Sequence, residues 1–142
     1  MIVTFCGHKD TIVTANLSEK LTSALEQLIG EGADQFYLGG YGAFDMLAAK
    51  TVKALKERYP QIRSTLVVPY LNQEYDKEIY DDTAYPPLEE VPRRFAISRR
   101  NEWMVDHADV VVAYVTHDWG GAASTLKYSE RKKKRIINIA TE

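Results

Sequence analysis

The sequence contains a single cysteine, Cys6, among its 142 residues, which excludes a framework of internal disulfides. One thiol is compatible with a reducing compartment. No apolar run approaches the roughly 20 residues that a membrane-spanning helix requires. The first ten residues lack the basic and apolar regions of a signal peptide. Together these absences predict a cytoplasmic protein that has no membrane partner.

A strong net charge is also missing. The 18 Lys and Arg residues nearly balance 20 Asp and Glu residues, so the formal charge is −2 and gives no general attraction to nucleic acid. No His, Cys or carboxylate pair has metal-ligand spacing, and we expect neither a metal nor another cofactor. The phosphate loop G-x-x-x-x-G-K-[ST] and the nucleophile motif G-x-S-x-G are absent, which disfavours a P-loop enzyme and a serine hydrolase.

Apolar runs and helical periodicities alternate along the chain. We expect strands at 2–6, 34–38, 63–71, 110–115 and 135–140, and helices at 17–29, 44–57, 93–107 and from about 122 to 133. Ser18 is the expected N-cap of the first helix. The alternation predicts one α/β domain over 1–142, a Rossmann-like three-layer sandwich. Its mostly parallel sheet of about five strands would carry helices on both faces.

Parallel strands with right-handed crossovers place all their carboxyl ends at one edge of the sheet, where ligands bind in such folds. The loops at this edge are 7–10, 39–42, 72–92 and 116–121, and three of the four contain glycine. The segment 72–92 is acidic and tyrosine-rich without clear periodicity. It is either a flap that closes the site, with a tyrosine stacked on a base, or a solvated connector.

The loop after the strand at 110–115 carries the strongest signal. Gly120 and Gly121 precede Ser124 and Thr125 at the start of a helix. Backbone N–H groups at such a start bind anions, and the hydroxyls add donors that a simple turn does not need. We expect a phosphate at this turn, with a structural turn as the alternative.

The turn Gly39-Gly40-Tyr41-Gly42 is not the dinucleotide fingerprint G-x-G-x-x-G, because position 45 is Asp45 instead of glycine. Gly39 and Gly40 therefore either contact a ligand or form a tight turn. Asp45 either complements the helix dipole or accepts a hydrogen bond from a ribose hydroxyl.

Arg100 and Asn101 share a predicted helix face with Ile97, Met104 and Ala108, where a core helix would carry leucine. An arginine fork there indicates either a buried ion pair or a clamp for phosphate or carboxylate.

The turn after the first strand and the basic run near the end of the chain each have two interpretations. Gly7 and His8 follow the first strand and either contact the ligand or close the turn. The basic run 131–135 either complements the end of a helix or forms a nucleic-acid patch.

Taken together, these motifs resemble the SLOG superfamily of Rossmann-like domains over nearly the whole chain. This group includes the lonely-guy phosphoribohydrolases and DNA-processing protein A, and the likeness is greatest to small bacterial and phage proteins grouped as DUF1273-like. The opening T-G-H-R pattern corresponds to 6–9, and the first glycine turn to 39–45. An R-x-x-x-M…D pattern corresponds to Arg100, Met104 and Asp109, and the last Gly-Gly turn to 120–125.

The chain departs from the phosphoribohydrolase motif P-G-G-x-G-T-x-x-E. Trp119 replaces the proline, and Lys127 stands where the glutamate of N-glycosidic hydrolysis is expected. The resemblance thus implies a pocket for a nucleotide-type ligand more firmly than catalysis, and we name no catalytic residue. The alternatives are a phosphoribohydrolase-like N-glycosidase and a single-stranded DNA-binding protein, and relatives of this kind form dimers, which suggests a homodimer.

Overall fold

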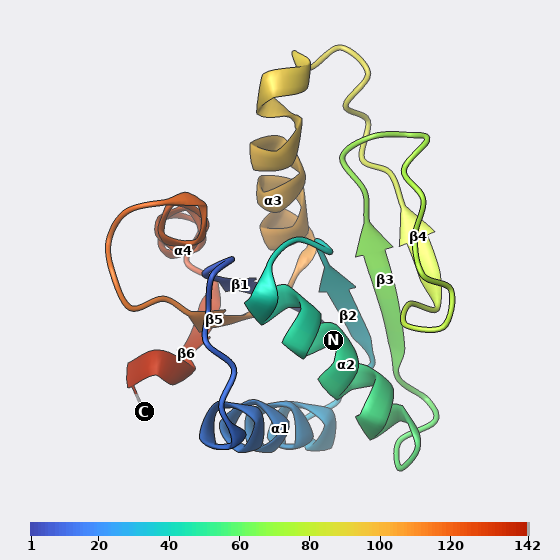
Figure 1. Ribbon diagram of the computed structural model, residues 1–142, viewed down its shortest axis with the longest axis vertical. Helices are drawn as coiled ribbons and strands as arrows, with labels where there is room; N and C mark the ends of the chain where they lie inside the picture. Colours follow the sequence, from blue (N-terminus) through green and yellow to red (C-terminus); the bar gives the residue numbers. More distant parts are fainter. Residues whose placement is uncertain (142) are drawn as a thin grey trace.

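A computed structural model describes residues 1–141 and confirms the Rossmann-like α/β prediction, with six strands instead of about five (Figure 1). The strands are β1 (Ile2–Gly7), β2 (Gln35–Leu38), β3 (Arg63–Val67), β4 (Asp82–Ala84), β5 (Val110–Tyr114) and β6 (Arg135–Asn138). The helices are α1 (Ala15–Gly30), α2 (Ala43–Lys56), α3 (Ala96–His107) and α4 (Gly121–Arg131), with 3-10 turns at Arg93–Phe95 and Ile139–Thr141.

All strand pairs are parallel, in the order β4-β3-β2-β1-β5-β6. The chain adds strands on one side of β1 as far as β4 and then crosses back to place β5 on the other side. The strand order therefore reverses between β1 and β5, and the carboxyl ends of these two strands frame the crevice where open α/β sheets bind ligands.

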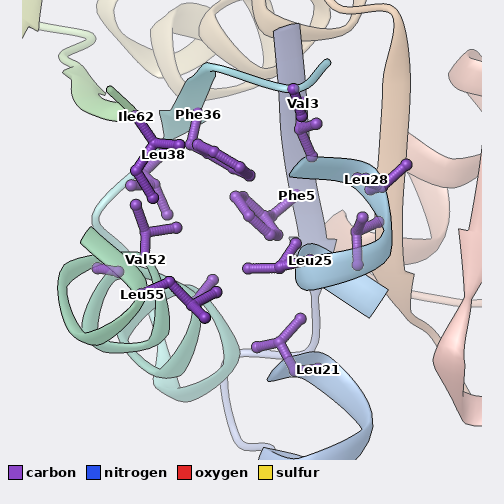
Figure 2. Close-up of a cluster of buried hydrophobic side chains, with 14 of the residues drawn as sticks. Val3, Phe5, Leu21, Leu25, Leu28, Phe36, Leu38, Val52, Leu55 and Ile62 are labelled. Atoms are coloured by element: carbon purple, nitrogen blue, oxygen red, sulfur yellow. The ribbon is translucent and has the colours of Figure 1, made fainter. Parts of the chain in front are cut away.

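The sheet is covered on both faces, as predicted. Val3 and Phe5 of β1 point into the cluster with α1 and α2, whereas Cys6 points to the face of α3 and α4. This alternation follows from the two-residue period of a strand. Figure 2 shows the larger cluster, in which leucines of α1 and α2 surround Phe5 and Phe36. Across residues 1–141, no helix has both the length and the apolarity to span a membrane.

Several predicted boundaries were wrong. The N-cap of α1 is Thr14 instead of Ser18, because the Thr14 hydroxyl accepts the N–H of Leu17 at 3.1 Å. The strand expected at 63–71 ends at Val67, and the one expected at 135–140 ends at Asn138 and continues as a 3-10 turn. The last helix ends at Arg131, before 133.

The segment 72–92 was expected to lack regular structure but contributes the sixth strand. Short β4 pairs with β3, which extends the sheet at its edge. Its tyrosines are taken up by the protein itself: Tyr80 is buried, and Tyr75 and Tyr85 pack against the same core cluster. The predicted flap with a tyrosine stacked on a base is therefore not what this segment forms.

Candidate functional site

A pocket of about 370 Å³ lies at the carboxyl ends of β1 and β5, between the loops that lead into α2 and α4 and the side of α3. Eight of the predicted site residues line it: His8, Gly39, Asp45, Arg100, Asn101, Gly120, Gly121 and Thr125. The pocket is also lined by residues that were not predicted to contact a ligand: Phe5, Cys6, Lys9, Asp10, Tyr41, Ile97, Met104, His117, Trp119 and Ala122.

Three predicted residues do not line the pocket. Gly7 packs against the ring of Phe44, where an added Cβ would lie 2.2 Å from Cδ2. Gly40 has a positive φ of 73° and lies against Leu66. Ser124 faces a neighbouring groove between α3 and α4. The first two glycines are thus required by packing and by the turn.

Two helix starts face the crevice, and they have nearly the same backbone conformation. Gly42 caps α2 with φ 95° and ψ 170°, and Gly120 caps α4 with φ 93° and ψ 176°. The start of α2 is closed by the protein itself. The N–H of Ala43 donates to the carbonyl of Lys9 at 2.8 Å, and the N–H of Gly40 donates to the carboxylate of Asp45.

The start of α4 is open. Gly120 provides no side-chain cap, and the first bond of the helix runs from the N–H of Ser124 to the carbonyl of Gly120 at 3.0 Å. The N–H groups of 121–123 precede that bond and have no acceptor within the helix. They carry the positive end of the helix dipole beside the pocket, an arrangement suited to an anion.

Arg100 lies buried on the inward face of α3, as predicted, and it forms no ion pair among residues 1–141. Its Nη1 donates to the carbonyls of Gly39 and Val67, both at 2.8 Å, and its Nε donates to Asn101 at 2.9 Å. The side chain therefore joins α3 to the ends of β2 and β3 while it forms part of the pocket wall. Ile97, expected on the same face, is 42% exposed and lies at the pocket.

Burial raises the pKa of Asp45, and this rise is only partly offset by hydrogen bonds from backbone N–H groups, foremost that of Gly40, and by the charge of Arg100. Burial, with a smaller effect of Asp45, also raises the pKa of the Cys6 thiol to about 12, so the thiol is protonated and not a nucleophile at neutral pH. Within residues 1–141, no group of three His, Cys, Asp or Glu side chains could hold a metal ion.

Three stacked rings form one wall of the pocket. His8 stacks on His117 with centroids 3.7 Å apart, and His117 stacks on Trp119 at 3.8 Å. Sequence spacing does not predict this arrangement, because His8 lies more than a hundred residues before the other two. Burial, followed by the charge of His117, lowers the pKa of His8, while Asp10 acts in the opposite direction.

Lys127, which stands at the position of the family's glutamate, does not enter the pocket. Its ammonium donates to the carbonyl of Asp118 at 3.0 Å and so stabilises the loop before α4. Asp109 of the R-x-x-x-M…D pattern is also structural, since its carboxylate accepts the N–H of Ile2 at 2.7 Å.

The basic run 131–135 is largely engaged with the protein. Lys132 pairs with Asp106, and Arg135 pairs with Glu31. Lys134 donates to two carbonyls at the end of α3. These contacts fit the interpretation of the run as charge at a helix end better than that of a nucleic-acid patch.

Comparison with known sequences identifies the family. Residues 6–141 match the YpsA family model, described as the YspA SLOG family. The chain belongs to this family. The predicted SLOG resemblance is thereby confirmed. The chain is also 25% identical over 138 residues to the uncharacterized SPbeta prophage-derived protein YoqJ of Bacillus subtilis (strain 168), with 81% of each chain covered.

Solved structures share the fold of this SLOG chain. DNA processing protein A from Helicobacter pylori, described for its single-stranded DNA binding mode, aligns with a TM-score of 0.67 and 16% identity. The alignment covers 96% of this chain but only 63% of that one, less than two thirds of its length. The Moco carrier protein of Chlamydomonas reinhardtii aligns with a TM-score of 0.60 and 16% identity, covering 98% and 75%. These likenesses show the fold alone.

Proposed function

We propose that this SLOG protein binds a nucleotide or nucleotide-derived ligand in the pocket, with a phosphate on the start of α4. The observation that carries this proposal is the contrast between the two helix starts. Asp45 accepts the N–H of Gly40 and the carbonyl of Lys9 accepts that of Ala43, whereas the N–H groups of 121–123 have no acceptor within α4 and no partner shown among residues 1–141. An anionic group of a ligand is the partner that this geometry favours.

The aromatic wall supports a nucleobase beside that phosphate. Trp119 is 67% exposed although His117 stacks on it, so a large part of its surface is available to a ligand. Tyr41, which is 61% exposed, also lines the pocket. A base stacked on an aromatic side chain gains about 1–3 kcal/mol. The carboxylate oxygens of Asp10 and Asp45 provide acceptors for ribose hydroxyls.

The direct test is calorimetric titration with AMP, GMP, CMP and UMP. In Gly121→Asp, a carboxylate would lie at the open helix start and repel the phosphate, so we expect affinity to fall at least tenfold. Gly121→Ala is the matched control and should bind as the wild type does, since a Cβ at Gly121 meets nothing within 4 Å. Absence of binding to all four monophosphates, or equal binding by the two variants, would contradict the proposal.

Fluorescence tests where the base lies. In Trp103→Phe, Trp119 is the one tryptophan left, and we expect the bound monophosphate to quench its emission by stacking. In Trp119→Phe, the remaining Trp103 is stacked between Tyr37 and His107, so the same ligand should leave the emission unchanged. Quenching of Trp103 alone would place the base elsewhere.

The two alternatives have less support. N-glycosidic hydrolysis lacks its glutamate, since Lys127 holds the loop at Asp118 instead. Single-stranded DNA binding through 131–135 has less support because Lys132 and Arg135 of that run are paired with carboxylates. The cytoplasmic location, the absence of a cofactor and a homodimer remain predictions.

A further inference from the structure

A second cavity adjoins the nucleotide pocket. It is a groove of about 330 Å³ between α3 and α4, and it shares Ile97, Asn101, Gly121 and Thr125 with the pocket. The two spaces therefore meet at the open start of α4. Each is near the lower end of the ~300–1,000 Å³ that is typical of small-ligand sites.

Polar side chains line this groove although it lies between two helices that pack together. Ser124, Lys127, Tyr128 and Arg131 also line it, at the i, i+3, i+4 and i+7 positions that form one face of α4. The facing side of α3 contributes further polar groups from Ser98, Asn101 and Glu102. The groove thus offers hydrogen-bonding groups and one aromatic ring.

Arg131 gives the far end of the groove a positive charge, whereas the ammonium of Lys127 is turned back toward the loop before α4. Lys127 and Arg131 form no ion pair among residues 1–141; Lys127 donates to a carbonyl, and Arg131 lies over the Tyr128 ring at 5.6 Å. Glu102, the acidic side chain of the groove, is 3.9 Å from Arg99. At 1.5 Å per residue, the backbone of Arg131 lies about 15 Å along α4 from Gly121.

We propose that the groove is a subsite for a second nucleoside and its terminal phosphate, so that the preferred ligand is a 5′-phosphorylated dinucleotide. This inference rests on the proposed function. The bridging phosphate would occupy the start of α4, with one nucleoside in the pocket and the other in the groove beside Tyr128. The terminal phosphate would then lie beside Arg131, and Lys127 would reach it once its ammonium leaves the carbonyl of Asp118. The distance of about 15 Å along α4 from Gly121 to Arg131 is longer than the two phosphates of a nucleoside diphosphate.

The test compares AMP, ApA and pApA, or the same series for the base that the monophosphate panel selects. We expect ApA to bind more tightly than AMP, and pApA to bind about three- to tenfold more tightly than ApA, because a partly exposed phosphate gains charge-assisted hydrogen bonds. In Arg131→Gln the advantage of pApA over ApA should fall at least twofold while AMP affinity stays unchanged. In Lys127→Gln/Arg131→Gln it should disappear.

Lys50→Gln removes one positive charge from an exposed site on α2, across the sheet from the groove, and should keep the full advantage of pApA. Equal affinities of AMP, ApA and pApA in the wild type would overturn the dinucleotide subsite but leave nucleotide binding intact. Failure of all three to bind would overturn both proposals. Binding of long single-stranded DNA alone, with a steep salt dependence, would indicate a nucleic-acid interface instead.

Discussion

His8 is joined to Thr116 across the crevice: the Nε2 of His8 accepts the backbone N–H of Thr116 at 2.9 Å. This bond joins the loop after β1 to the loop that leads into α4. A protonated Nε2 cannot accept a hydrogen bond, so the bond requires a neutral imidazole. Burial and the adjacent His117 lower the pKa of His8 below its ordinary 6.5 and favour the same neutral form.

The first prediction concerns the pH dependence of stability. Because the pKa of folded His8 lies below the unfolded value of 6.5, its stabilisation is complete above that pH and is lost as the pH falls below it. The free energy of unfolding, measured with urea, should therefore fall from pH 7 to pH 5. In His8→Gln, whose amide oxygen can accept the same N–H without titrating, the fall should be smaller.

The paired carboxylates do not interfere with this measurement, and the buried Asp45, whose pKa is raised, is common to the wild type and His8→Gln. The pKa values of Glu26, Glu31 and Asp81 are lowered from 4.5, 4.5 and 3.8, so these groups titrate below the range from pH 7 to 5. Parallel stability curves for the wild type and His8→Gln would show that His8 is not the titrating group.

Arg100→Met should destabilise the fold by removing the donor to two carbonyls. The buried carbonyls of Gly39 and Val67 would lose their hydrogen-bond donor, and we expect the free energy of unfolding to fall by about 2–4 kcal/mol. Urea unfolding measures the loss. Arg99→Met, a change at the exposed neighbour in α3, is the control and should stay within about 0.5 kcal/mol of the wild type. A comparably small effect of Arg100→Met would contradict the structural role.

Gly7→Ala should destabilise the protein through overpacking. The new Cβ would overlap Cδ2, Cγ and Cβ of the buried Phe44, atoms that cannot give way without moving α2. We expect the free energy of unfolding, measured with heat or urea, to fall by about 1–3 kcal/mol. Gly30→Ala in the last turn of α1 meets no atom within 4 Å and should instead be neutral or stabilising by about 0.5–1 kcal/mol. Equal effects of the two substitutions would refute the packing role.

Lys127→Glu restores the residue type that the phosphoribohydrolase motif carries, and it should not create hydrolysis. Position 127 lines the groove between α3 and α4 and not the pocket, so the new carboxylate would not face the sugar. Chromatography should detect no free base after incubation with AMP, for either the variant or the wild type. Release of adenine by Lys127→Glu alone would show that the groove side of α4 reaches the glycosidic bond.

Much of the fold was predictable because its signals are local. The apolar run before Tyr114 predicts a buried parallel strand, and the leucine spacing of α1 predicts a helix. Strand β4 was not predicted, because its three residues, Asp82–Ala84, are too few to show an alternating pattern. Pairing with β3 holds this segment in the sheet. The cap at Thr14 was missed because Ser18 also suits a helix start, and the choice depends on where the chain turns after β1.

The sequence by itself determined that the glycine turns would meet at one edge of a parallel sheet. The strands and helices follow from local residue patterns, and helical connections between parallel strands place the carboxyl ends of the strands at the same edge. Only the tertiary structure decided which turn is open to a ligand. Asp45 folds back on Gly40, and the guanidinium of Arg100 is engaged by strand carbonyls. The stack of His8 on His117 likewise joins residues far apart in the chain. Such contacts depend on side-chain directions after packing, and sequence spacing does not encode them.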